Sequence, residues 1–280
     1  MQENLLKIGY LGPKGTFTQQ AAWILFPKND FVPIGDIHSV FCAVSTGRCD
    51  AGVVPLDNST EGPVNATLDA LLEAEDLTIT TLLVLPISHV LMGAANTRNA
   101  EKILAHPQAL AQCRKYIRHH YPDAELVPCT SNGEAAVKVA SADKPWASVG
   151  PAAAAKEYGL SIWAEGIQDS CHNKTGFIQI EKSGGQNLSP KPNCRTSIAF
   201  STENRPGSLY RILGIFENHN INMTKIFSRP MPTQPGEYIF FVDIEDYQVK
   251  DAENALKQVG NEAAIYRFLG SYPVKRGETK

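Results

Sequence analysis

Short apolar runs alternate with helix-like segments over most of the chain, from Leu5 to about Ile180. This pattern is typical of α/β folds, in which helices cover a sheet with parallel strands. The clearest pairs of strand and helix are residues 8–10 with 16–26, residues 51–55 with 64–75, and residues 147–149 with 151–158. We therefore expect an α/β architecture for the first two thirds of the chain.

A stretch rich in glycine, proline and polar residues follows at 182–193, which is long for a loop inside a compact domain. We predict a first domain at 1–182, a linker at 183–193 and a second domain at 194–280. The second domain has the pattern of a ferredoxin-like βαββαβ arrangement, with Pro206 near the first position of its first helix. Its expected elements are strand 196–200, helix 206–219, strand 222–227, strand 238–244, helix 250–260 and strand 264–270.

The charge and cysteine patterns exclude several classes of function. A net charge of -3 from 26 basic and 29 acidic residues, without a long single-sign run, gives no reason to expect nucleic acid or a membrane surface as a partner. The N-terminus lacks the features of a signal peptide, and no apolar run approaches the length of a membrane helix, so we expect a cytoplasmic protein. The six cysteines include no C-x-x-C pair. We expect no metal site and no cofactor.

The segment Gly12-Pro-Lys-Gly-Thr-Phe-Thr18 follows an expected strand and opens an expected helix. Its backbone amides and the helix dipole can receive an anion, with Lys14 adding a positive charge. The alternative is an ordinary turn in which Thr16 or Thr18 caps the helix. A nucleotide site is not expected, because the segment does not fit the phosphate-binding G-x-x-x-x-G-K-[ST] pattern.

Two further segments place polar residues between a strand end and a helix start, where ligands bind in open α/β sheets. In residues 54–64, Asn58 and Ser59 are the expected donors, although both residue types also serve turns and helix caps. In residues 105–113, Gln108 and Gln112 lie four positions apart and share a helix face that can line a cleft. A solvated helix face is the alternative there.

Together with His172-Asn-Lys-Thr-Gly-Phe177, these segments stand in the order found in bacterial prephenate dehydratases that carry a C-terminal ACT domain. The chain resembles that family from about Ile8 to Tyr272, and residues 206–209 and 228–230 extend the likeness into the second domain. The resemblance implies two α/β lobes similar to periplasmic binding proteins, with the active site in the cleft between them. It also implies a homodimer or homotetramer whose paired ACT domains bind phenylalanine.

The activity implied by the resemblance is conversion of prephenate to phenylpyruvate, water and carbon dioxide, with feedback regulation by phenylalanine. Thr175 is then the candidate proton donor to the leaving hydroxyl group. The resemblance makes Asn58, Ser59 and Gln112 candidates for orienting the substrate, and the candidate binding residues are Lys14, Thr16, Gln108, Lys174 and Phe177. The expected phenylalanine site comprises Gly207, Ser208, Leu209, Asn222 and Ser228.

Four positions depart from the family pattern: Asp57, Ala105, Gly176 and Phe227 stand where the family has glutamate, serine, arginine and glutamate. Gly176 lacks a charged contact worth about 1.5–3 kcal/mol, for which Lys174 or Lys14 could substitute. If that contact is missing, Gly176→Arg should raise kcat/KM. The departures leave three alternatives: an arogenate dehydratase, a prephenate decarboxylase that does not aromatise its substrate, or a catalytically inactive amino-acid-binding sensor.

Overall fold

The structure is a computed structural model that describes residues 5–184, 189–231, 237–245 and 247–277. It divides into two compact units: the first comprises residues 1–68, 83–178 and 276–280, and the second comprises 69–82 and 179–275. Residues 185–188 of the expected linker lie outside the described residues. The boundaries predicted at 182 and 194 therefore stay a prediction.

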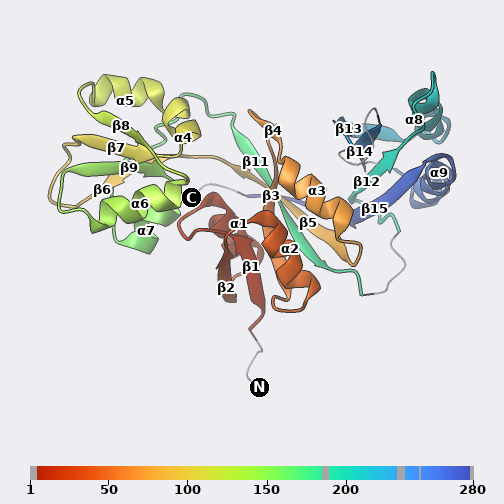
Figure 1. Ribbon diagram of the computed structural model, residues 1–280, viewed down its shortest axis with the longest axis horizontal. Helices are drawn as coiled ribbons and strands as arrows, with labels where there is room; N and C mark the ends of the chain where they lie inside the picture. Colours follow the sequence, from red (N-terminus) through yellow and green to blue (C-terminus); the bar gives the residue numbers. More distant parts are fainter. Residues whose placement is uncertain (1–4, 185–188, 232–236, 246, 278–280) are drawn as a thin grey trace. The chain divides into compact units, whose positions relative to one another are not determined.

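The first lobe of the first unit is built on the parallel strands β1 (Lys7–Leu11), β2 (Asp30–Ile34) and β3 (Ala51–Asn58) (Figure 1). The sheet order is β16-β5-β11-β3-β1-β2, with β4 (Gly62–Pro63) beside β3. Strands β5 (Leu77–Pro86) and β11 (Lys174–Lys182) continue into the second unit, as does helix α3 (Asn65–Glu73), and β16 spans Val274–Arg276.

Helices α1 (Phe17–Leu25) and α2 (Ile37–Ser45) cover this sheet because strands such as β3 are apolar over consecutive residues and must be buried on both faces. The core against α1 contains Tyr10, Val53, Leu85 and Phe177, which are buried to within a few per cent. The expected α/β construction is confirmed. Thr16 is the N-cap of α1, and its Oγ1 accepts a hydrogen bond from the Gln19 N–H.

The second lobe has the strand order β10-β6-β9-β7-β8. The strands are β6 (Val90–Gly93), β7 (Lys102–Ala105), β8 (Glu125–Pro128), β9 (Trp146–Gly150) and β10 (Ser161–Glu165). The helices are α4 (Pro107–Gln112), α5 (Arg114–His120), α6 (Asn132–Ser141) and α7 (Ala152–Tyr158). Alternating strand residues pack on opposite faces of the sheet: Leu91 and Ile103 lie in the cluster with α4 and α5, whereas Val90 and Met92 lie with α6 and α7.

The sheet of this lobe is mixed, because parallel pairs occur beside an antiparallel strand. β6 is antiparallel to both β9 and β10. It is the strand by which the chain enters the lobe from β5, and it lies between β9 and β10, which run in the opposite direction. Only the pairs of β7 with β8 and β9 are parallel.

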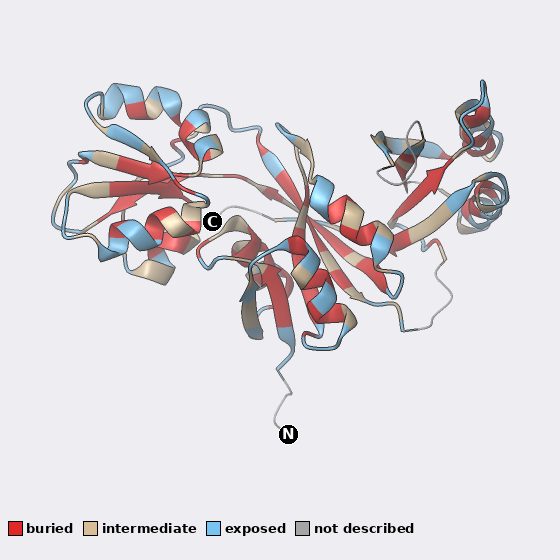
Figure 2. Cartoon of the chain, in the orientation of Figure 1, coloured by how far each residue is buried: buried red, intermediate tan, exposed pale blue. Residues whose placement is uncertain are grey.

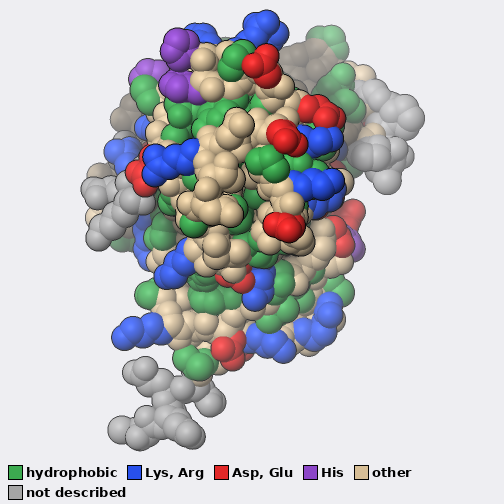
Figure 3. Space-filling view, turned by 90° about the vertical axis from the view of Figure 1, so that its left-hand side faces the viewer, with side chains coloured by type: hydrophobic (Ala, Val, Ile, Leu, Met, Phe, Trp, Pro, Cys, Tyr) green, Lys and Arg blue, Asp and Glu red, His purple; other side chains and the backbone are tan. Residues whose placement is uncertain are grey.

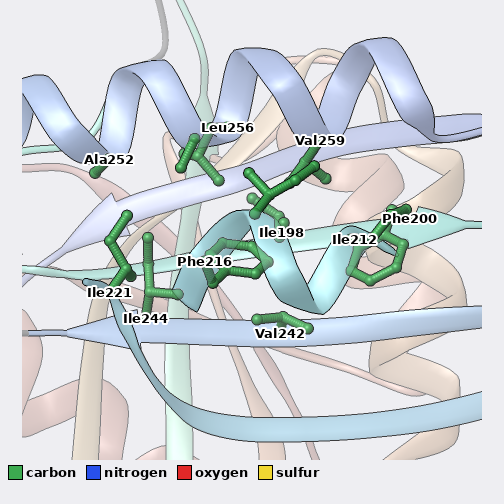
Figure 4. Close-up of a cluster of buried hydrophobic side chains, with 12 residues drawn as sticks. Ile198, Phe200, Ile212, Phe216, Ile221, Val242, Ile244, Ala252, Leu256 and Val259 are labelled. Carbon is green, nitrogen blue, oxygen red and sulfur yellow. The ribbon is translucent and has the colours of Figure 1, made fainter. Parts of the chain in front are cut away.

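In the second unit, the ACT-like portion has the expected βαββαβ order. Its elements are β12 (Arg195–Ser201), α8 (Ser208–Asn218), β13 (Asn222–Pro230), β14 (Tyr238–Glu245), α9 (Val249–Glu262) and β15 (Ile265–Tyr272), with sheet order β13-β14-β12-β15. Side chains from α8, α9 and the sheet, including Phe216, Leu256 and Val242, form its core (Figure 4). Helix α8 begins two residues later than expected, so Pro206 lies before it. The reason is that Gly207 adopts a left-handed conformation, with φ of 82°, and acts as the N-cap.

Burial follows the apolar periodicity: the central strands and the inner helix faces are buried, and the outer helix faces are exposed (Figure 2). On the face shown in Figure 3, basic and acidic side chains are interspersed. None of the described helices is long and apolar enough to cross a membrane.

Candidate active site

A cavity of about 370 Å³ in the first unit is lined by residues from both lobes. The first lobe contributes polar and aromatic side chains from the end of β3, the start of α1 and β11, and the second lobe contributes side chains from both ends of α4 and from the start of α6. The lining residues used below are Thr16, Phe17, Asn58, His89, His106, Gln108, Gln112, Ser131, Asn132, Asn173, Thr175 and Phe177. Sequence analysis had named six of these: Thr16, Asn58, Gln108, Gln112, Thr175 and Phe177.

Strand β11 supplies the cavity wall through alternate residues. Thr175 and Phe177 of the strand line the cavity together with Asn173, which immediately precedes it, as the two-residue period of an extended chain requires. Gly176 is buried and lies on the opposite face of the strand. The expectation that an arginine at position 176 would reach a substrate carboxylate is therefore not supported by the strand geometry.

Asn58 fixes the orientation of Thr175. Its Oδ1 accepts hydrogen bonds from the backbone N–H groups of Thr60 at 2.9 Å and Glu61 at 3.2 Å, so its Nδ2 must face the other way. Nδ2 donates to Thr175 Oγ1 at 2.8 Å and to an oxygen of Asn173 at 2.9 Å. Because Thr175 Oγ1 accepts here, the hydrogen of its hydroxyl group is left to donate to another atom.

The hydrogen-bond network continues from Asn173 into the second lobe. Asn173 Oδ1 also accepts from Thr60 Oγ1 at 3.3 Å, and Asn173 Nδ2 donates to Gln112 Oε1 at 3.2 Å. Gln112 Oε1 lies 3.0 Å from His89 Nε2. The network thus links Thr175 and Asn58 of the first lobe to Gln112 of the second through side chains alone.

His89, Asn173 and Thr60 are members of this network that sequence analysis did not name as site residues. Asn173 had a usable signal, since it precedes Thr175 by two residues and so shares its face of the strand. His89 lies between β5 and β6 without any local motif, and it is only 3% exposed. Burial lowers the pKa of its imidazole, and the ring packs edge-on against Phe17 at a centroid distance of 5.4 Å.

The structure places the two candidate lysines apart from the cavity. Lys14 Nζ forms an ion pair with Glu157 Oε1 at 3.1 Å, and the Lys14 carbonyl accepts from the Tyr158 hydroxyl at 2.9 Å. Both partners belong to α7, so the loop turns this side chain toward the second lobe. The side chain of Lys174 is exposed and does not line the cavity. Among the described residues that do line it, none is lysine or arginine.

Ser59 lies beside the cavity wall and supports β11. Its Oγ accepts from the Lys174 N–H at 2.9 Å, and its own N–H donates to the Lys174 carbonyl at 2.8 Å. Ser59 does not line the cavity. This geometry indicates that Ser59 holds the loop after β3 against the start of β11.

The expected phenylalanine-binding residues are not all together in one chain. Gly207, Ser208 and Leu209 line a cavity of about 280 Å³ at the start of α8. Asn222 and Ser228 are exposed on β13 and do not line it.

The remaining departures from the family pattern have structural roles. Ala105 is fully buried in the core beside α4, and Phe227 stacks on Phe241 with ring centroids 5.4 Å apart. Asp57 is half-buried on β3, where it pairs with Pro63 of β4.

The family profile of prephenate dehydratases matches residues 8–184, and the ACT domain profile matches residues 196–261. The chain belongs to the prephenate dehydratase family. It is 40% identical to the bifunctional chorismate mutase/prephenate dehydratase of Aquifex aeolicus, over 97% of this chain and 74% of that protein. It is 38% identical to the prephenate dehydratase of Methanocaldococcus jannaschii, over 95% of this chain and 97% of that protein. The resemblance found in the sequence is thereby confirmed.

The fold also matches a solved member of the family. The crystal structure of prephenate dehydratase from Arthrobacter aurescens in complex with L-Phe aligns with a TM-score of 0.86 and 31% sequence identity. The alignment covers 96% of this chain and 90% of the other.

Proposed function

We propose that this protein converts prephenate to phenylpyruvate, water and carbon dioxide. Its membership of the prephenate dehydratase family supports this assignment. The observation that carries it is the pairing of Asn58 with Thr175 on the wall of the first-unit cavity, which leaves the Thr175 hydroxyl hydrogen free to be donated.

The protein's main task in this reaction is to position the substrate and to supply one proton. Prephenate is a dianion that gains an aromatic ring when it loses its hydroxyl group and one carboxylate, so much of the driving force lies in the substrate. The bond from the ring to the carboxylate carbon breaks, its electron pair enters the ring, and carbon dioxide leaves. The ring C–O bond breaks at the same time, and the departing oxygen needs a proton to leave as water.

Thr175 is the proposed donor of that proton. A threonine hydroxyl is a weak acid, and the Asn58 Nδ2–H bond to Oγ1 stabilises negative charge that develops on this oxygen. Solvent then returns a proton to Thr175. The side chain is 8% exposed in the structure, so the hydrogen bond acts in surroundings that contain little water.

Two helix N-termini are the proposed sites for the carboxylates. The first turns of α1 and α6 both border the cavity, at Thr16 and Phe17 and at Ser131 and Asn132. The first backbone N–H groups there have no carbonyl partner within the helix and form the positive end of the helix dipole. Gln108 and Gln112 add amide donors, and Phe177 offers an apolar surface to the ring.

Regulation by phenylalanine is part of the same proposal. The ACT profile match, the cavity at the start of α8 and the bound L-Phe in the Arthrobacter relative support it. Because Asn222 and Ser228 lie on β13 and away from that cavity, we propose that a second copy of the chain completes the site, as a homodimer or homotetramer.

We also propose that the protein is cytoplasmic. Its six cysteines are free thiols, which is typical of proteins in a reducing compartment.

The test is to incubate purified protein with prephenate and, separately, with arogenate, and to follow the products by proton NMR. Thr175→Ala protein and buffer are the controls. The proposal predicts phenylpyruvate from prephenate at a rate that depends on Thr175. Phenylalanine formed faster from arogenate would identify an arogenate dehydratase, and a product that is not aromatic would identify a decarboxylase. The absence of any product from either compound would support the catalytically inactive amino-acid-binding sensor.

A further inference from the structure

His89 is held where two crossovers between the lobes of the first unit meet. It lies between β5 and β6, on the path from the first lobe to the second. Its backbone N–H donates to Gln168 Oε1 at 2.9 Å, and its carbonyl accepts from the Ile167 N–H at 3.1 Å. Residues 167 and 168 belong to the return path between β10 and β11. These two hydrogen bonds fix the backbone of His89, and with it the position of the imidazole ring, at the junction of the lobes.

The hydrogen bonds of the network decide which imidazole nitrogen carries the proton. The starting point is Asn58, whose Oδ1 is held by two backbone N–H groups and whose Nδ2 therefore faces Asn173 Oδ1. Asn173 must then direct its Nδ2 toward Gln112, and the atom of Gln112 that receives it is Oε1. Since Oε1 has no hydrogen, His89 Nε2 at 3.0 Å has to be the donor.

The neutral ring consequently has its hydrogen on Nε2 and a lone pair on Nδ1. Nδ1 is buried and has no hydrogen-bond partner within the described part of the chain. A second proton on it would place an uncompensated charge in an almost fully buried ring. The environment of His89 thus favours one neutral tautomer.

This tautomer reinforces the direction of the Gln112 carboxamide that the Asn173 hydrogen bond sets. Gln112 Oε1 receives two N–H donors, from His89 and from Asn173, so a flipped amide would turn its NH₂ group against both. The NH₂ group of Gln112 therefore faces the cavity that this residue lines, where it can donate a hydrogen bond. We propose that His89 is a positioning residue for the dehydratase reaction, and that its Nε2–H holds Gln112 so that the amide nitrogen donates to a substrate oxygen. This role rests on the proposed function.

The competing role for His89 is simple space filling against Phe17, which an apolar residue of similar size would also perform. His89→Leu removes the donor and keeps the volume, whereas His89→Gln can return an N–H group to Gln112. We expect kcat/KM for prephenate to fall about 10- to 100-fold in His89→Leu and to stay within about threefold of wild type in His89→Gln. Leu91→Val, in the neighbouring core, is the control for lost packing alone and should change the thermal midpoint and not kcat/KM.

A second measurement reads the tautomer without turnover. In protein labelled with ¹⁵N-histidine, the NMR chemical shifts of the His89 ring nitrogens should identify a hydrogen on Nε2 and a bare Nδ1 at neutral pH. Together with rescue by His89→Gln, this result supports the role even if His89→Leu does not fold.

The outcomes separate the two proposals. A hydrogen on Nδ1, a fully active His89→Leu variant, or a His89→Gln variant as slow as His89→Leu would overturn the role of His89. A loss of kcat/KM in Leu91→Val that matches the loss in His89→Leu would assign the effect to packing and also overturn it. Wild-type protein that forms no phenylpyruvate would overturn the proposed function, and the positioning role with it, whatever the tautomer.

Discussion

The cavity of the first unit and the cavity at the start of α8 differ in how much of each site one chain supplies. In the first, side chains from both lobes are already joined by hydrogen bonds from Thr175 to Gln112. In the second, three of the five expected residues line the hollow, and Asn222 and Ser228 lie elsewhere on an exposed strand. The two chain connections between the lobes can preorganise the first site before its ligand binds. A site that includes residues of an edge strand such as β13 depends on the chain that packs against that edge.

The largest effect on activity is expected from substitution of Thr175. This prediction tests whether one chain supplies a complete catalytic site in the first cavity. Thr175→Ala should lower kcat for prephenate by about 100-fold or more, because it removes the proposed proton donor. Thr175→Ser keeps the hydroxyl and should retain far more activity. Steady-state kinetics with circular dichroism as a folding check provide the measurement. A wild-type kcat in Thr175→Ala would exclude the residue as the acid.

Asn58→Asp tests whether the amide network organises that site. The carboxylate keeps an oxygen for the N–H groups of Thr60 and Glu61 but loses the N–H that Thr175 Oγ1 accepts. It also brings a negative charge near an anionic substrate. We expect kcat/KM to fall by about 10- to 100-fold with a small change in thermal midpoint. Equal losses of activity and stability would indicate a purely structural role for Asn58.

Dilution compares the two cavities directly. If a partner chain completes the second cavity, the heat of phenylalanine binding per chain should decrease as the oligomer dissociates, and phenylalanine at 100 times its Kd should stabilise the oligomer by about 2.7 kcal/mol. The kcat measured without phenylalanine should stay constant per chain. Calorimetry and kinetics over the same concentration range, with sedimentation as the reference, test both statements. A kcat that falls in step with dissociation would mean that the first cavity also needs the partner.

Gly176→Arg examines the face of β11 that points away from the first cavity. The residue is buried, so an arginine there should lower the free energy of unfolding by about 2 kcal/mol or more without improving kcat/KM. Urea denaturation and prephenate kinetics would be measured together, with the exposed neighbour Lys174→Arg as the matched control. A gain in kcat/KM would restore the view that this chain lacks a carboxylate-binding arginine.

The smallest effect concerns pH. Burial lowers the pKa of His89 below its ordinary value of 6.5, so the unfolded chain binds a proton in a range where the folded chain does not. The contribution of His89 to the free energy of unfolding is fully present above pH 6.5. It is lost as the pH falls from 6.5 through the pKa of His89 in the folded protein. The thermal midpoint of the wild type should therefore decline more steeply below pH 6.5 than that of His89→Gln. Parallel curves would contradict a neutral buried His89.

The sequence predicted what local patterns determine. Periodicity identified three strand–helix pairs of the first unit and the βαββαβ order of the ACT-like portion, and the polar residues after β1 and at the end of β3 identified Thr16 and Asn58 as site candidates. What it could not predict depends on contacts between distant segments. His89 carries no motif, and its importance arises only when the crossover brings it against Gln112. Lys14 looked available in a glycine-rich loop, but its charge is balanced by Glu157, 143 positions away in the sequence.

The most direct test of the central claim, that Asn58 activates Thr175 in the first cavity, is a double-mutant cycle on kcat for prephenate. The four proteins are the wild type, Thr175→Ala, Asn58→Asp and the double variant, each checked for folding. If Asn58 acts through Thr175, the double variant should be no slower than Thr175→Ala alone, because the partner of the Asn58 N–H is already gone. Losses that multiply in the double variant would contradict the claim, because they would mean that the two residues act independently.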